Sequence, residues 1–139
     1  MLHKRLLELI ASHTDILERI RREEIKWGDI LELYAVLHTL QIHAQAVIDY
    51  LLHTCAITGI SPETPIRCIE ELKIRRMIRS GDAMFMKRVV RFRNILVHEY
   101  TSIDIERVKR AIETQGYVRA LQIINELQKK LEKSGLLDP

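Results

Sequence analysis

The fold is decided by the stretch DILELYAVLHTLQIHAQAVIDYLLHTCAI, residues 29–57, which is mainly aliphatic and contains neither glycine nor proline. Asp29 followed three residues later by Glu32 resembles a capping box, a common start of a helix. Pro62 and Pro65 follow in the next loop, and neither can sit inside a continuing helix. The stretch therefore predicts one long, mostly buried helix from Asp29 to about Ile57.

Helical spacing of apolar residues continues on both sides of this stretch. The first helix is expected to end at about Ile25, before the break at Trp27-Gly28. After the loop, the spacing predicts a shorter helix at about 66–78 and another at about 83–98, separated by Ser80-Gly81-Asp82.

The end of the chain predicts one more helix. Thr101 with Asp104 is the expected cap, the helix is expected to reach about Lys133, and Gly116 is a candidate kink. The loops are short, which favours antiparallel neighbours. We therefore expect an all-α fold, an antiparallel bundle of about five helices in a single domain over residues 1–139.

Composition limits the class of protein. Hydrophobic residues make up 47% and aromatic residues 5% of the 139 residues, with few glycines and prolines, which is typical of helical domains. Neither a signal peptide nor a membrane span is evident, so a cytoplasmic location is expected. Cys55 and Cys68 are expected to be buried or idle reduced thiols. His53 with Cys55 is too small a set to predict a metal site, and no metal or cofactor is expected.

A polar row on the predicted helix at 83–98 attracts attention. Its members Lys87, Arg91, Asn94 and His98 fall within about 60° of one another on a helical wheel. They belong to a basic segment, 73–93, that could be a solvated face or a patch for phosphates. The opposite side is expected to face the core, with Phe85, Val89, Phe92 and Leu96.

Arg93 belongs to neither side of that helix. The wheel places it near Met86, Val90 and Val97, on an apolar flank where a charge needs a partner.

The long helix carries a second polar row, formed by His38, Gln41, Gln45, Asp49 and His53. One interpretation is that this row is the solvent side of the helix. The other is that both rows share one polar cleft, in which Asp49 offsets the charge of Arg93, Arg91 or His98.

Arg93 and His98 are about 140° apart on an ideal helix, so they do not converge by helical geometry alone. Three routes would bring them together: the long arginine side chain wraps around, the helix unwinds near His98, or another copy of the protein completes the site.

These residue types suit phosphodiester cleavage. A histidine exchanges protons near neutral pH, and an arginine offers a fork of donors to a phosphate. In a metal-free reaction a base activates the ribose 2′-hydroxyl, which attacks phosphorus while arginine stabilises the phosphorane. The alternative is structural: His98 at a helix end, Arg93 in an ion pair, and Tyr100 as an ordinary surface residue.

The segment Arg93-Asn94-Ile95-Leu96-Val97-His98-Glu99-Tyr100 resembles the signature of HEPN-domain ribonucleases, specifically of HepT-type toxins encoded beside small nucleotidyltransferase antitoxins. The resemblance extends over most of the chain. It implies a homodimeric helical bundle whose two motifs meet in a composite cleft and cut RNA without metal.

The polar rows themselves make Asp49 a candidate supporting residue, and Lys87 and Arg91 the residues expected to bind RNA. Carried over by position, the resemblance implies that Arg93 and His98 are the catalytic pair and that Asn94 supports them. Tyr100 would accept adenylate from the nucleotidyltransferase partner, which silences the toxin.

One residue departs from the pattern, because Glu99 stands where a smaller or neutral residue is expected, and a carboxylate there repels phosphate. The alternative function is a non-catalytic helical module that partners a nucleotidyltransferase or presents its substrate.

Overall fold

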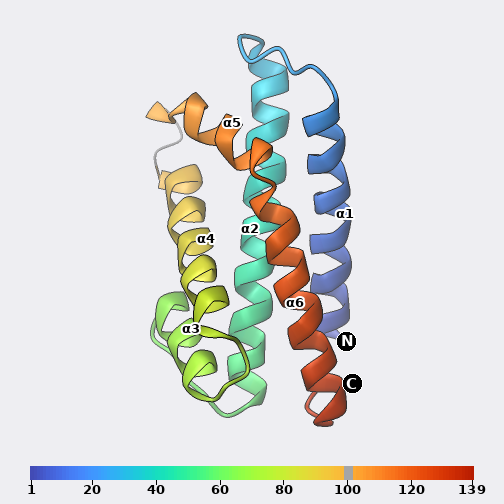
Figure 1. Cartoon of the computed structure of the whole chain (residues 1–139), viewed down its shortest axis with the longest axis vertical. Coiled ribbons are helices and arrows are strands. Elements are labelled where there is room, and N and C mark those ends of the chain that lie inside the picture. Colours follow the sequence, from blue (N-terminus) through green and yellow to red (C-terminus); the bar gives the residue numbers. More distant parts are fainter. Residues whose placement is uncertain (99–101) are drawn as a thin grey trace.

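The computed structural model describes residues 1–98 and 102–139, and the helices account for most of them (Figure 1). Their bounds are α1 (Leu2–Arg22), α2 (Ile30–Ile57), α3 (Pro65–Ile74), α4 (Ser80–His98), α5 (Ile105–Glu113) and α6 (Gly116–Lys133). The expected all-α bundle is confirmed, with six helices in the described residues in place of about five.

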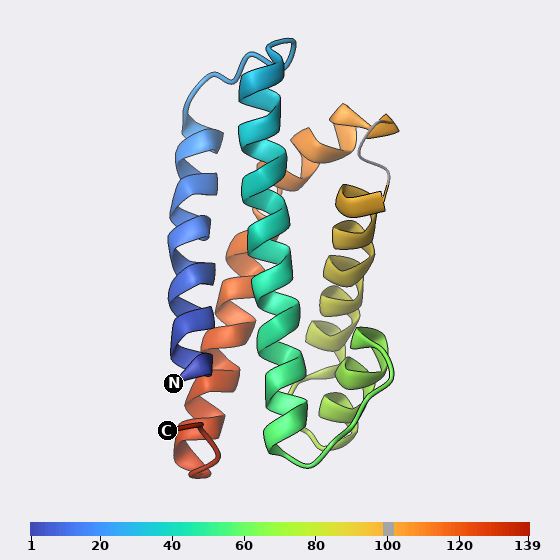
Figure 2. The ribbon, with the colours of Figure 1, turned by 180° about the vertical axis from the view of Figure 1, so that it is seen from behind.

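The long helix α2 is the centre of the bundle, with contacts to α1, α3, α4 and α6. Helices α1 and α6 run along one side of it and α4 along the other, while α5 crosses obliquely near one end (Figures 1 and 2). The chain ascends in α1 and α4 and descends in α2 and α6, so α2 is antiparallel to α1 and α4, and α6 is antiparallel to α1 but parallel to α2. None of the described helices has the length and hydropathy needed to cross a bilayer.

Helix ends follow local chemistry. Asp29 caps α2 by accepting a hydrogen bond from the Leu31 amide at 2.9 Å, as expected. Thr64 caps α3 in the same way, with Pro65 in its first turn. Asp104 accepts from the Glu106 amide and is the cap of α5, whereas the expected cap Thr101 lies outside the described residues.

Several expected bounds are wrong by a few residues. α1 ends at Arg22, three residues early, and α4 begins at Ser80, three residues early. α3 ends at Ile74, well before the expected Ile78, and is followed by Arg76 in the left-handed conformation at φ 59°. The candidate kink at Gly116 is a complete break between α5 and α6, because Gln115 adopts φ 55°.

One of two apolar clusters fixes the end of α4 that carries the signature motif. Leu96 of α4 is fully buried there with Leu40 of α2, Val108 and Ile112 of α5, and Tyr117 of α6. Burying one such aliphatic side chain contributes about 1.5–3 kcal/mol. The last turn of α4 is therefore held against three other helices by packing.

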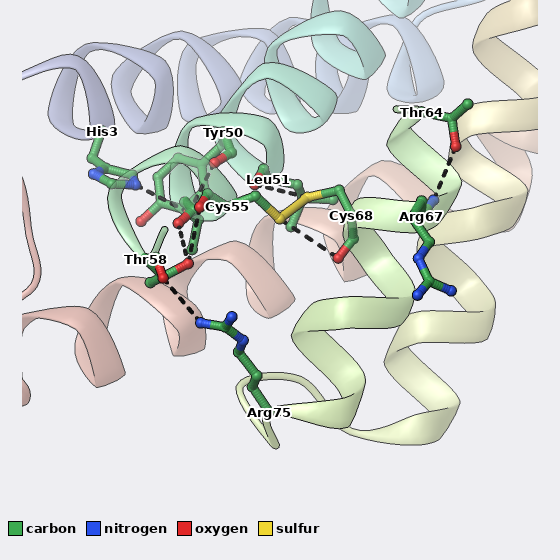
Figure 3. The surroundings of a disulfide bond; sticks show 10 residues. His3, Tyr50, Leu51, Cys55, Thr58, Thr64, Arg67, Cys68 and Arg75 are labelled. Atoms are coloured by element: carbon green, nitrogen blue, oxygen red, sulfur yellow. Dashed lines mark hydrogen bonds between the residues drawn. A yellow bond between two sulfur atoms is a disulfide. The ribbon is translucent and has the colours of Figure 1, made fainter. Parts of the chain in front are cut away.

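Cys55 near the end of α2 and Cys68 of α3 form a disulfide (Figure 3). Both residues are fully buried, as expected, but the expectation of reduced thiols is wrong. The loop at 58–64 turns α3 back against α2 and brings the two Cα atoms to 6.2 Å, a normal separation for a disulfide. The number of residues between two cysteines does not show whether the chain folds back on itself, so the sequence alone did not predict this disulfide.

Candidate active site on helix α4

Arg93 projects from α4 toward α2 and is half-buried. Its Nη1 donates a hydrogen bond of 2.8 Å to Oε1 of Gln45, and Nε2 of Gln45 donates one of 2.8 Å to Oδ1 of Asp49. The expectation that Arg93 needs a partner on an apolar flank is confirmed. The partner is the amide of Gln45, which also binds Asp49.

The Nε atom of Arg93 is buried and has no hydrogen-bond partner in the described part of the chain. A buried unpaired donor costs about 1–3 kcal/mol. An acceptor oxygen that reached this nitrogen would recover much of that cost. Gln45 therefore holds one arm of the guanidinium, while Nε stays buried and unpaired.

Gln41, one turn before Gln45 on α2, also contacts α4. Its Nε2 donates a hydrogen bond of 2.8 Å to the carbonyl oxygen of Leu96, in the last turn of α4. Two residues of the polar row on α2 thus bind α4, at Arg93 and at the Leu96 carbonyl, and neither of these belongs to the polar row on α4. The residues at the two ends of that row do not take part in these contacts with α4. His38 is exposed, and His53 contacts Asp138.

His98 is the last residue of α4 and is exposed. The helix is continuous through His98, so it does not unwind between Arg93 and His98. The Arg93 side chain turns toward Gln45 on α2 and not around the helix toward His98. Of the three routes to convergence, the contribution of another copy remains.

The other members of the polar row on α4 differ in their surroundings. Lys87 forms an ion pair with Glu70 of α3, so its charge is partly offset. Arg91 and Asn94 are exposed. Arg91 has no carboxylate within ion-pair distance among the described residues. Its charge is therefore less offset than that of Lys87.

The core side of α4 is rotated from the expected one. Leu96 is fully buried as predicted, but the other buried residues are Ala83, Met86 and Val90. Phe85, Val89 and Phe92 are only half-buried, because they line a cavity among α2, α4, α5 and α6. Tyr100 and Glu99 lie outside the described residues.

That cavity has a volume of about 190 Å³ and is lined mainly by apolar side chains. His43 of α2 and Tyr117 of α6 are its buried polar residues, with ring centroids 6.3 Å apart. Burial, with repulsion from His13 second, lowers the pKa of His43 to about 4, so the imidazole is neutral at pH 7.

A wider groove of about 590 Å³ lies between α4, α5 and α6 and shares Phe85, Arg88, Phe92 and Ala111 with the cavity. Its other basic residues are Arg91, Arg107, Arg110 and Arg119. The basic segment at 73–93 pointed to the α4 part of this surface. The α5 part was missed, although Arg107 and Arg110 are spaced three apart and so share one side of a helix.

A polar cluster near the two ends of the chain was also missed. Nδ1 of His3 lies 3.0 Å from Oδ1 of Asp138, and Nε2 of His53 lies 3.1 Å from Oδ2. The three side chains offer possible metal ligands within 4.8 Å of one another, yet each short contact is also a hydrogen bond. Sequence separation hid this group, since His3 and Asp138 are at opposite ends of the chain.

Known structures share this fold. YutE, a cytosolic protein of unknown function from Bacillus subtilis, superposes with a TM-score of 0.76 at 14% identity over 98% of this chain and 95% of its own. A crystal structure of a toxin-antitoxin with AMP-PNP gives a TM-score of 0.76 at 16% identity over 88% of this chain and 97% of that one. No curated protein matches the chain. Residues 6–134 match the family described as ribonuclease HepT-like, and the chain therefore belongs to that family.

Proposed function

We propose that this protein is a metal-independent endoribonuclease that acts in the cytoplasm as the toxin of a toxin–antitoxin pair. Membership of the HepT-like ribonuclease family supports RNA as the substrate. The observation that carries the proposal is Arg93, anchored by Gln45 and Asp49 with a buried donor still unpaired, on the same helix as the exposed His98.

The reaction uses no group beyond the RNA and the protein. His98 takes the proton of a ribose 2′-hydroxyl, whose oxygen attacks the adjacent phosphorus as the bond from phosphorus to the 5′ oxygen breaks. A proton returns to that leaving oxygen. Arg93 stabilises the charge on the phosphorane, and Asn94, one residue further along α4, orients the phosphate or the imidazole. A 2′,3′-cyclic phosphate and a free 5′-hydroxyl result.

The active form we propose is a homodimer. Within one copy α4 is continuous and Arg93 is bound to Gln45, so Arg93 and His98 stay on different sides of the helix. A symmetric pairing can bring His98 of one copy to Arg93 of the other. Light scattering should give the mass of a dimer at micromolar concentration. A fully active monomer would make the composite site untenable.

We further propose that a cognate nucleotidyltransferase is the antitoxin and silences the protein by adenylating Tyr100. A toxin-antitoxin of similar fold has been solved with AMP-PNP, a nucleotide analogue suited to adenylate transfer. An added phosphate two residues after His98 would repel substrate phosphate.

Mass spectrometry of the chain co-expressed with its partner tests the assignment of Tyr100. Adenylate should appear on the peptide that contains Tyr100, and Tyr100→Phe should remain toxic beside the partner. Adenylate found only on Tyr34, Tyr50 or Tyr117, or a Phe variant silenced like wild type, would favour simple steric capping by the antitoxin.

The catalytic assignment is tested with His98→Ala and His13→Ala, which removes a histidine on α1, away from α4. Cleavage of RNA in EDTA should fall about 10²–10⁴-fold in His98→Ala and stay unchanged in the control, because a positioned proton donor or acceptor contributes that much. Both should keep wild-type helicity and mass, since His98 is exposed and the hydrogen bonds of the half-buried His13 stay within α1.

Undiminished cleavage by His98→Ala would overturn the role of His98, and loss of wild-type cleavage in EDTA would overturn the metal-free mechanism. A wild type that binds its nucleotidyltransferase without cutting RNA would show the non-catalytic module instead.

A further inference from the structure

The groove between α4, α5 and α6 gathers positive charge that carboxylates offset at only one position among the described residues. Five arginines line it: Arg88, Arg91, Arg107, Arg110 and Arg119. In the described part of the chain, only Arg119 has a carboxylate within 4 Å, Asp82 at 3.7 Å. Like charges that line one groove repel one another. A bound polyanion would relieve this repulsion and stabilise the protein.

The floor of the groove is aromatic and apolar. Phe85 and Phe92 line both the groove and the cavity, so the two hollows lie side by side. The guanidinium carbons of Arg119 and Arg88 lie 4.5 Å and 5.7 Å from the centre of the Phe85 ring. A nucleotide carries a phosphate next to a flat aromatic base. Arginines beside an aromatic-lined pocket can therefore bind both of its parts.

The groove also leads toward the proposed site of cleavage. Arg91 and His98 are seven residues apart on a continuous helix, hence about 20° apart around it and about 10 Å apart along it. Arg88 continues the row from Arg91 into the groove. A strand lying across Arg88 and Arg91 would therefore extend along α4 toward His98.

We propose that this groove binds single-stranded RNA, with phosphates on the arginines and one base inserted between Phe85 and Phe92 into the cavity. The identity of the strand rests on the proposed ribonuclease function, whereas the groove and its charge do not. A duplex keeps its bases stacked and paired, so it cannot offer one to the cavity. Single strands should therefore bind more tightly than duplexes of the same length.

The experiment measures fluorescence anisotropy of a labelled RNA oligonucleotide in the His98→Ala background, where the probe stays intact. The first variant, Arg107→Gln with Arg110→Gln, removes two exposed charges from α5. Its matched control, Lys4→Gln with Arg5→Gln, removes two exposed charges from α1, which lines neither hollow. Heparin, a polyanion without bases, serves as the competing probe.

The arginine variant should bind RNA several-fold more weakly. It should also show a salt dependence flatter by about 1.4 in log Kd against log salt, since each single-strand phosphate contact contributes about 0.7. The α1 control should change neither. Equal losses in the two variants would overturn the groove as the binding surface.

The cavity is tested separately by Ala111→Leu, which adds volume at a half-buried position shared by groove and cavity. Affinity for single-stranded RNA should fall while affinity for heparin stays the same. Unchanged RNA affinity, or equal affinity for duplex and single strand, would overturn base insertion and indicate a general anionic surface, such as one for an acidic protein.

Binding and cleavage fail independently in this design. A wild type that never cleaves would overturn the proposed ribonuclease and leave the anisotropy results standing. If the protein cleaves RNA but its affinity for RNA does not depend on Arg107 and Arg110, only the assignment of the groove as the RNA-binding surface is overturned.

Discussion

Replacing His43 by glutamine is expected to change how stability depends on pH. His43 lies in the core, with Nε2 3.0 Å from Oγ1 of Thr14. The Thr14 hydroxyl donates to the carbonyl of Ile10 at 2.8 Å, so its oxygen is free to accept from an imidazole N–H. A neutral ring fits this setting and a charged ring does not.

The pKa gives the size of the effect. Burial lowers the pKa of His43 from 6.5 to about 4, so the unfolded chain binds the proton more tightly than the folded one. The stability from His43 is therefore fully present above pH 6.5 and is lost as pH falls toward 4. Between pH 7 and pH 4.5 the loss is about 2 to 3 kcal/mol.

Urea unfolding followed by far-UV circular dichroism at several pH values measures this loss. His3 also loses stability as pH falls, because its pKa is lowered too, and burial is the largest cause. The difference between wild type and His43→Gln isolates His43 and should shrink as pH falls. His38→Gln, an exposed histidine on the same helix, is the control. A difference that stays constant from pH 7 to pH 4.5 would refute the reasoning.

Other predictions concern the contacts around α4 and the disulfide. Gln45→Leu leaves Arg93 without its acceptor and should lower the free energy of unfolding by about 1–3 kcal/mol in urea titration; an unchanged value would mean that this bond adds nothing. Cys68→Ala should cost about 3 kcal/mol and make stability insensitive to reductant, whereas a reductant-sensitive variant would contradict the disulfide. Replacing Lys87 and Arg91 by Gln should flatten the salt dependence of RNA binding, mostly through Arg91 because Lys87 is already paired; a double variant with the wild-type slope would contradict their role.

Periodicity predicted the helices well because each has one apolar side to bury. It placed α2 within one residue at both ends, since Asp29 and the loop prolines act locally. The break at Gln115 was not predictable, because nothing in that residue type demands a left-handed backbone. The wheel also placed Arg93 on an apolar flank, where a charge needs a partner, but could not identify that partner.

Partners depend on how helices rotate against one another, which a single helix does not determine. Gln45 was expected in a polar row with Asp49, yet only packing shows that its amide stands between Asp49 and Arg93. The cavity was hidden for the same reason. Phe85 and Phe92 look like core residues on a wheel, but they line hollows among α2, α4, α5 and α6 and are only half-buried.

The spacing of Gln41, Gln45 and Asp49 limits how the length of this protein can vary. They follow one another every four residues, so they form a single row along α2, from Leu96 to Arg93 and beyond. Inserting or deleting one residue between them would rotate the rest of α2 by about 100°. The contacts with α4 and the core side of α2 would be misaligned together. Changes in length should therefore not be tolerated within α2.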